Sequence, residues 1–258
     1  MKWIKSIFRL IICKMDYTQN ILEYYDELFP VSSEQKLFYD EILKSFPIEP
    51  KVLSIGCGTG AFEHHLSRHN CNVTGIDHIP GLLESASRRH RQPGCSIRFF
   101  HMAITEMTQY LGKGFYNIIS CINNRLSPIP NAVRMEQFFR DCRNLLSPKG
   151  YFILQVPNYP YYTCQPVAML PVSESIRSKL LTKLITDDNG TRMLRQVETS
   201  NGRLVTVINN EQVYPVAPQD IEELALETGF KSAEFYSSFS KAPFIPESSP
   251  NIICVMQA

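Results

Sequence analysis

Residues 51–60, KVLSIGCGTG, place three glycines in five positions directly after a short apolar segment. The apolar part, residues 51–55, is typical of a strand that is buried on both faces. A helical pattern begins right after Gly56, Gly58 and Gly60. Glycine lets a ligand approach the backbone closely, and the N–H groups at the start of a helix attract anionic groups. The run therefore predicts a strand–loop–helix unit that binds a small, partly anionic ligand.

An acidic residue, Asp77, follows the first glycine of this loop by 21 residues. Asp77 ends the next predicted strand, residues 71–77. Neighbouring parallel strands end at the same edge of a sheet, where a carboxylate can accept hydrogen bonds from both hydroxyls of a ribose. Loop and acid together predict a ligand that contains a nucleoside. Gly56, Gly58 and Ala61 also satisfy the dinucleotide fingerprint, so a nicotinamide enzyme stays an alternative.

Strand and helix patterns alternate along most of the chain. Further strands are predicted at 96–100, 115–122, 151–156, 231–237 and 251–257. Helices are predicted at 16–28, 33–46, 61–68, 80–89, 135–146 and 218–228. Such alternation is typical of a parallel sheet with right-handed crossovers. No second mononucleotide-binding half is evident, which argues against the nicotinamide enzyme.

With these segments in place, the chain resembles the class I S-adenosylmethionine-dependent methyltransferases over about residues 16–258. The similar segments are VLSIGCGTG, VTGID, FYNIISCINNRLS, LLSPKGYFIL and the late GF…NIICVMQ pair. It resembles more narrowly the small-molecule branch that includes glycine N-methyltransferase-like enzymes. The residues that carry this closer resemblance are Tyr25-Asp26, Asn124 and Gln155-Val156-Pro157-Asn158-Tyr159.

The resemblance implies an α/β fold: a Rossmann-like, seven-stranded mixed sheet with the last strand antiparallel, flanked by helices. It implies S-adenosyl-L-methionine as cofactor and methyl transfer to a nitrogen or oxygen of a small molecule. The candidate cofactor-binding residues are Tyr25, Gly56, Gly58, Gly60, Asp77, His78, Met102, Ala103, Cys121 and Asn124. The candidate acceptor-binding residues are Tyr17, Arg125, Asn158, Tyr159 and Arg192. No catalytic base is assigned, because a sulfonium methyl is already activated and its displacement depends mainly on positioning.

The chain departs from the family pattern at two places. The family usually has an acid two residues before the first glycine, which orders the methionine end of the cofactor; here that residue is Ser54. It also usually has an acid after the third strand, and here the run is His101-Met102-Ala103. Met102 is therefore expected to pack on the adenine, with backbone atoms near Ala103 at its edge. Ser54 keeps open the alternative of a protein that binds S-adenosylmethionine without turnover.

Residues 160–216 interrupt the alternation of strand and helix. A helix is predicted at 173–185, with Leu180 and Leu184 on its apolar side, followed by a β-hairpin that turns at Asn201-Gly202. We interpret this segment as a small cap of helix plus β-hairpin, inserted into the methyltransferase domain near the predicted site.

The predicted domain organisation has three parts. Residues 16–159 and 217–258 form the methyltransferase domain, residues 160–216 the cap, and residues 1–15 a basic amphipathic extension. In the cap, Arg192 and Arg195 lie three apart on one predicted strand and so point to opposite faces. One of the two is expected to bind a carboxylate of the acceptor.

Charge and cysteine content limit the partners. The formal net charge is +1, and residues 1–15 carry four basic and no acidic residues, so the rest sums to −3 and does not favour nucleic-acid binding. The extension is too short to span a bilayer, and weak contact with a membrane surface stays an alternative to docking on the body. The eight cysteines contain no C-x-x-C pair. We expect a cytoplasmic monomer or homodimer with a small-molecule methyl acceptor.

One pair of histidines has metal-ligand spacing. His65 and His69 lie at i,i+4 on the helix after the glycine loop. Glu63 points away from their face, and no third ligand is evident in the sequence. We therefore expect a solvated helix face and no metal.

Overall fold

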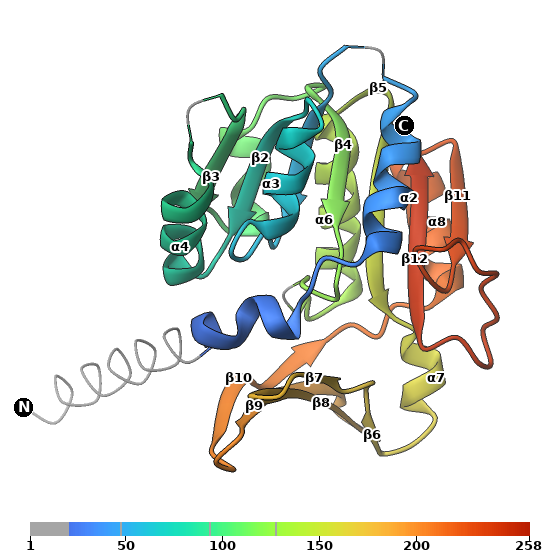
Figure 1. Ribbon diagram of the computed structural model, residues 1–258. Coiled ribbons are helices and arrows are strands. Elements are labelled where there is room, and N and C mark those ends of the chain that lie inside the picture. The colour runs from blue at the N-terminus through green and yellow to red at the C-terminus, as the bar shows by residue number, and fades with distance from the viewer. Residues whose placement is uncertain (1–20, 47, 93, 127) are drawn as a thin grey trace, which may run out of the picture.

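The structure, a computed structural model, describes residues 21–46, 48–92, 94–126 and 128–258. It contains a seven-stranded sheet and a second, antiparallel five-stranded sheet, which lies below the first in Figure 1. The predicted extension at 1–15 and the candidate residue Tyr17 lie outside the described residues. In the part of the chain that is described, no helix is long and apolar enough to cross a membrane.

The seven-stranded sheet has the strand order β11-β12-β5-β4-β1-β2-β3. Its strands are β1 (Lys51–Ile55), β2 (Asn72–Asp77), β3 (Ile97–His101), β4 (Tyr116–Cys121), β5 (Leu146–Pro157), β11 (Ser232–Tyr236) and β12 (Asn251–Gln257). Neighbours from β3 to β5 pair in parallel, whereas β12 pairs antiparallel with both β5 and β11. The predicted mixed sheet with an antiparallel last strand is confirmed.

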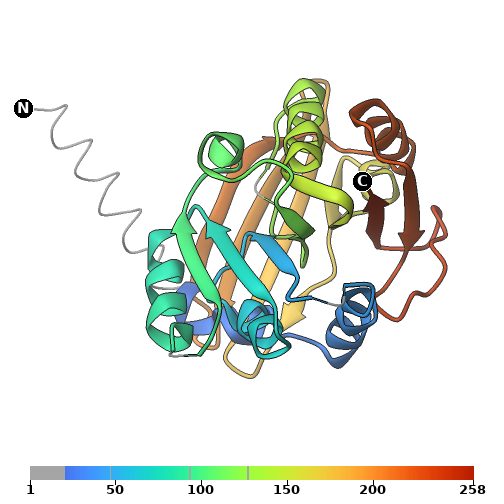
Figure 2. The same cartoon turned by 90° about the horizontal axis from the view of Figure 1, so that it is seen from above.

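Helices cover both faces of this sheet (Figure 2). On one face lie α2 (Ser33–Leu43), α3 (Ala61–Arg68) and α4 (Pro80–His90), and on the other α5 (Met107–Tyr110), α6 (Ala132–Leu145) and α8 (Pro218–Thr228). A 3-10 turn, η1 (Ile104–Glu106), precedes α5. Local signals explain several helix ends. Ser32, one residue before the predicted cap, accepts a hydrogen bond from the Gln35 N–H, and Gly229 ends α8 with a φ of +91°.

The second sheet contains five strands and follows the short helix α7 (Tyr159–Thr163). Its strands are β6 (Val167–Met169), β7 (Ser173–Glu174), β8 (Ser178–Asp187), β9 (Gly190–Thr199) and β10 (Leu204–Val213). The predicted hairpin turn at Asn201-Gly202 joins β9 to β10. The helix predicted at 173–185 is wrong, because these residues form β7 and β8. We call β6–β10 the cap sheet.

The error at β8 has a simple physical cause. Leu180 and Leu184 are four residues apart, and that spacing puts two side chains on one face of either a helix or a strand. In the structure they lie on the buried face of β8, opposite Val197 and Met193 of β9. Only pairing with β9, which the spacing does not reveal, selects the strand.

A helical segment at 21–28 lies between the two sheets, as the dark blue ribbon in Figure 1 shows. Its buried residues Ile21, Tyr25 and Leu28 form one hydrophobic cluster with Leu180 and Val197 of the cap sheet. The segment therefore packs on the cap while its other side faces the end of the parallel strands.

Candidate functional site

The glycine loop after β1 adopts a backbone that other residues rarely take. Gly56, Gly58 and Gly60 have φ angles of +72°, +58° and +77°. The N–H groups of Gly56 and Cys57 donate to the carbonyl of Ile76 at 2.9 and 3.0 Å, which ties the loop to β2. Gly60 is the N-cap of α3. The predicted strand–loop–helix unit is thus present, with bare α-carbons along its turn.

Asp77 lies where the sequence places it, at the end of β2 and against this loop. Its carboxylate is 6% exposed and accepts hydrogen bonds from the N–H groups of Gly58 and Ile79, both at 2.9 Å. The ring of His78 approaches the same carboxylate, with 3.6 Å between Nδ1 and Oδ1. Two backbone donors hold the carboxylate at the edge where ligands bind in parallel sheets.

Tyr25 covers the loop from the other side. A Cβ atom added to Gly58 would lie 2.2 Å from the Tyr25 hydroxyl and 2.3 Å from two of its ring carbons. Burial raises the pKa of this phenol, so the hydroxyl stays neutral at physiological pH. The aromatic ring therefore occupies the space through which a ligand would approach the bare backbone of Gly58.

Arg125, a candidate for acceptor binding, is instead half-buried against the same loop. Its Nη1 atom lies 3.4 Å from the carbonyl oxygens of both Gly56 and Cys57. Its guanidinium carbon is 5.2 Å from the centre of the Tyr25 ring. Burial opposes the charge, but the field of Tyr25, Glu63 and Asp77 outweighs it and raises the pKa of Arg125. A fixed cation thus lies beside the glycine loop.

Glu63 is a buried acid beside the loop that the sequence did not predict as a site residue. It is 1% exposed, and its Oε1 atom accepts a hydrogen bond from the Ser54 hydroxyl at 2.5 Å. Its Oε2 atom is buried and has no hydrogen-bond partner among the described residues. Burial raises the pKa of this carboxyl, against the lowering effect of Arg125. A carboxylate from α3 therefore reaches the strand position where Ser54 replaces the usual acid.

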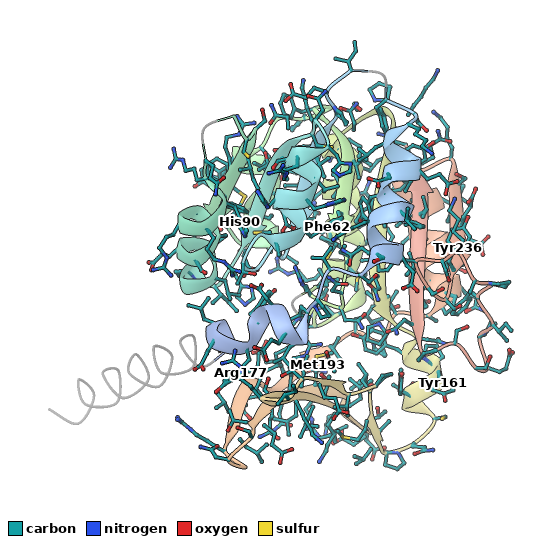
Figure 3. All side chains as sticks on the ribbon, viewed as in Figure 1. Phe62, His90, Tyr161, Arg177, Met193 and Tyr236 are labelled. Carbon is teal, nitrogen blue, oxygen red and sulfur yellow. The ribbon has the colours of Figure 1, made fainter. Side chains whose placement is uncertain are left out.

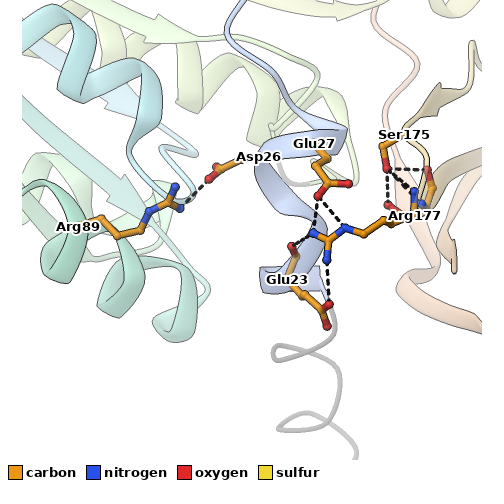
Figure 4. A network of polar contacts seen from close by, with 7 residues as sticks. Glu23, Asp26, Glu27, Arg89, Ser175 and Arg177 are labelled. Carbon is orange, nitrogen blue, oxygen red and sulfur yellow. Dashed lines mark hydrogen bonds and ion pairs between the residues drawn. The ribbon is translucent and has the colours of Figure 1, made fainter. Parts of the chain in front are cut away.

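Charged contacts fix the helical segment at 21–28 over the loop (Figure 4). Asp26 pairs with Arg89 of α4 at 2.6 Å and accepts a hydrogen bond from the Thr59 hydroxyl. On the cap side, Arg177 contacts Glu23 at 3.2 Å and Glu27 at 2.9 Å. Exposed ion pairs each contribute little to stability. Together they define where this segment sits between the loop, α4 and the cap.

A small cavity of about 20 Å³ lies between the parallel sheet and the cap sheet. Figure 3 places Met193, one of its lining residues, on the face of the cap that points to the parallel sheet. Its polar lining residues are Asn124, Tyr159, Arg195 and Tyr214. The volume holds about one water molecule, so a larger ligand requires the cap to move.

Arg195 rather than Arg192 faces this cavity. Arg195 is 7% exposed, and it donates to the Thr182 hydroxyl at 3.1 Å and to the Asn124 carbonyl at 3.3 Å. Arg192 lies on the opposite face of β9 and pairs with Asp187. The two arginines do point to opposite faces, but the structure does not bring Arg192 to the cavity.

Two further candidates lie near the cavity with different roles. Asn124 has a left-handed backbone with a φ of +50°, and its amide donates to the Asn251 side chain at 3.0 Å. The Asn158 amide donates to the carbonyls of Pro246 and Ser249 at 2.7 and 2.8 Å. Asn158 thus holds the connection before β12 instead of facing the cavity, whereas its neighbour Tyr159 lines it.

The remaining candidates follow the third and fourth strands. Met102 and Cys121 are buried in the main hydrophobic core. The Ala103 N–H already donates to the Glu106 carboxylate at 2.8 Å. An adenine edge would have to share this donor, or use another backbone atom beside it.

Comparison with known proteins agrees with this geometry. Residues 52–150, from β1 into β5, match the family model described as a methyltransferase domain. The match ends before the cap sheet begins.

Over less than half of its length the chain is similar to curated methyltransferases. It is 30% identical over 115 residues to a ubiquinone biosynthesis O-methyltransferase of Histophilus somni. That alignment covers 43% of this chain and 46% of the relative, so the chain spans about half the length of the curated relatives it matches.

Solved structures extend the likeness to the cap. The CcbJ methyltransferase from Streptomyces caelestis has a TM-score of 0.72 at 20% identity, covering 92% of this chain and 96% of that one. CalS10, an S-adenosylmethionine-bound amino pentose methyltransferase from Micromonospora echinaspora, has a TM-score of 0.61 at 16% identity, covering 88% and 92%. At such identities the likeness shows the fold alone.

Proposed function

We propose that the chain is an S-adenosylmethionine-dependent methyltransferase that acts on a small molecule. The observation that carries the proposal is the convergence of three features at one edge of the sheet: the bare loop at Gly58, the Asp77 carboxylate and the buried Glu63 carboxylate. The first suits close approach of a nucleoside, the second suits a ribose, and the third suits an ammonium group.

Each of these residues would contact a different part of the cofactor. Asp77 would accept the ribose hydroxyls, and the unpartnered Oε2 atom of Glu63 would accept the ammonium of the methionine end. Arg125, a half-buried cation on the loop, would pair with the methionine carboxylate. When bound, the cofactor supplies an activated methyl group on its sulfonium. Tyr25 must withdraw from Gly58 before the site can be filled, because its ring occupies that approach.

The acceptor site in this proposal is the cavity under the cap sheet. Asn124 lines the cavity, and the next residue, Arg125, contacts the glycine loop, so the two sites are adjacent. Most of the lining is apolar, with one buried cation at Arg195. We infer an acceptor with an apolar body and one anionic group, which Arg195 binds while the cap excludes water.

The lining also bears on the atom that is methylated. The described residues that line the cavity include no Asp, Glu or His. A hydroxyl acceptor needs a general base, whereas an unprotonated amine does not. Burial raises the pKa of Tyr159 to about 12, which makes it a poor base at neutral pH. The cavity therefore favours a nitrogen acceptor, as in the closer resemblance to glycine N-methyltransferase-like enzymes, although the curated relative is named an O-methyltransferase.

Two other functions were left open by the sequence. A nicotinamide enzyme with two mononucleotide-binding halves would have a six-stranded parallel sheet. The antiparallel β12, inserted between β5 and β11, argues against it. The alternative of a protein that binds the cofactor without turnover rested on the missing acid at Ser54. The Glu63 carboxyl, which accepts a hydrogen bond from Ser54, supplies an acid at that place.

Calorimetry and a turnover assay test the proposal. The protein should bind S-adenosylmethionine and not NAD, and it should release S-adenosylhomocysteine when incubated with fractionated small-metabolite pools. Binding of NAD alone would support the oxidoreductase, and cofactor binding without turnover in any pool would support a regulator. A cytoplasmic location and a monomeric or dimeric state stay predictions.

Replacing Asp77 by alanine is expected to weaken S-adenosylmethionine binding by about 10- to 150-fold. The change removes a charge-assisted contact to the ribose, typically about 1.5–3 kcal/mol. Titration calorimetry measures the effect, with Asp188→Ala in the exposed turn before β9 as the control. Equal affinities of the two variants would refute the ribose assignment.

Replacing Glu63 by glutamine is expected to weaken the same binding by about 10- to 150-fold, because a neutral amide replaces the carboxylate that pairs with the ammonium. Glutamine can still accept from Ser54, so the loop should keep its shape. Adenosine, which lacks the methionine end, should bind Glu63→Gln and the unaltered protein alike. A loss of adenosine affinity would mean that Glu63 acts only on the loop.

A further inference from the structure

A cluster of metal-binding side chains lies on the outer side of α2 and α3, apart from the proposed methyl-transfer site. His65 and His69 are four residues apart, at the end of α3. The fold brings Asp40 of α2 to the same point, and the three ligand atoms all lie within 4.8 Å of one another. This is the third ligand that the sequence did not show.

The distances suit a tetrahedral centre. Asp40 Oδ1 lies 3.4 Å from His69 Nδ1 and 3.9 Å from His65 Nε2. Ligands about 2.0–2.1 Å from a zinc ion are about 3.4 Å from one another in a tetrahedron. The ligand atoms lie within 4.8 Å of one another, so the two imidazoles, with ring centres 4.3 Å apart, need to converge by no more than about 1.4 Å. The His69 side chain is 45% exposed, so it has room to rotate.

The cluster also leaves polar atoms without partners. Asp40 Oδ1 and His65 Nε2 are both buried, and neither has a hydrogen-bond partner among the described residues. Buried polar atoms normally have one, and a bound ion is a recognised reason for an exception. Here both atoms point to one place, at which two imidazoles and a carboxylate meet.

We propose that Asp40, His65 and His69 form a zinc-binding site that links α2 to α3. Two imidazole nitrogens and one carboxylate oxygen are a ligand set that zinc accepts, with the fourth position left to water. The site belongs to helices on one face of the sheet, and Tyr39, next to Asp40, packs its ring against Phe62 of α3 at 4.8 Å. Zinc would therefore link two helices that already touch, and Gly60, the last glycine of the loop, is the N-cap of α3.

Calorimetric titration of the full chain with zinc chloride, after removal of metal by a chelator, tests this site. The unaltered protein should bind zinc, and Asp40→Asn and His69→Ala should each weaken that binding by at least about 10-fold. His64→Ala is the matched control, because His64 lies on the same helix but stacks on His90 at 4.6 Å, away from the cluster. It should bind zinc like the unaltered protein.

Thermal unfolding gives a second readout. Zinc at 100 times its dissociation constant should raise the Tm of the unaltered protein and of His64→Ala by about 5 °C, and that of His69→Ala by no more than about half as much. Circular dichroism of each variant checks that it is folded. If the unaltered protein binds no zinc, or if Asp40→Asn and His69→Ala bind it as tightly as the control, the proposal is wrong. Neither result depends on methyl transfer.

Discussion

Valine at position 58 is expected to abolish S-adenosylmethionine binding while the sheets stay folded. Gly58 has a φ of +58°, which a β-branched residue takes only with strain, about 1–2 kcal/mol. The new Cβ atom would also overlap the Tyr25 hydroxyl, 2.2 Å away, and push the segment at 21–28 off the loop. The branched side chain would then fill the space that the cofactor needs, so calorimetry should detect no binding.

Gly114→Val separates the two effects of this substitution. Gly114 has a φ of +61°, and an added Cβ there meets nothing within 4 Å. Gly114→Val should lose only the stability that the strained backbone costs, less than Gly58→Val loses in chemical denaturation, and it should bind the cofactor normally. If Gly58→Val also binds normally, the loop is a structural turn and the proposed cofactor site is lost with it.

Replacing Arg195 by methionine is expected to reduce methyl transfer by about 100- to 1,000-fold. Removing one partner of a buried charge pair commonly costs about 3–4 kcal/mol, and the anionic group of the acceptor would enter an apolar cavity without its cation. The cofactor site does not include Arg195, so S-adenosylmethionine affinity should change by no more than a few-fold. The readout is kcat/KM for S-adenosylhomocysteine release, once an acceptor is found.

Arg192→Met provides the control on the same strand. It removes an arginine from the opposite face of β9, where Arg192 pairs with Asp187, and should leave turnover unchanged. Arg195→Lys should restore part of the activity, because a cation returns without the planar pair of donors. Equal activities of Arg195→Met and Arg192→Met would exclude the cavity as the acceptor site.

The fold was predictable from the sequence where the apolar residues of a segment followed a single helical or strand periodicity. β1, β2 and α3 lie within a residue of their predicted bounds, because a buried apolar run, a glycine turn and an amphipathic helix each give an unambiguous pattern. The cap sheet was only half predicted. Asn201-Gly202 marked its hairpin, but β8 was mistaken for a helix, since its apolar residues repeat every four positions and suit both structures.

The site was predictable where a residue follows the loop or ends a strand, as Asp77 does. It was not predictable where a side chain crosses from another element. Glu63 reaches Ser54 because α3 folds back on β1, and Asp40 reaches His69 because α2 packs on α3. The one usable signal for Glu63 was an acid in the first turn of the helix after a loop that lacks its own acid. Arg195 could be told from Arg192 only by the register of β9.

The helical segment at 21–28 belongs to both binding regions at once. Tyr25 covers Gly58, while Ile21 and Leu28 pack on Leu180 and Val197 of the cap. A cofactor that displaces Tyr25 therefore changes the packing under the cap that closes the acceptor cavity. Binding at the two sites is then coupled, and thermodynamic linkage makes the coupling reciprocal. In the proposed function, the factor by which the cofactor changes acceptor affinity must equal the factor by which the acceptor changes cofactor affinity, so one helix would make the methyl donor and the methyl acceptor mutual effectors.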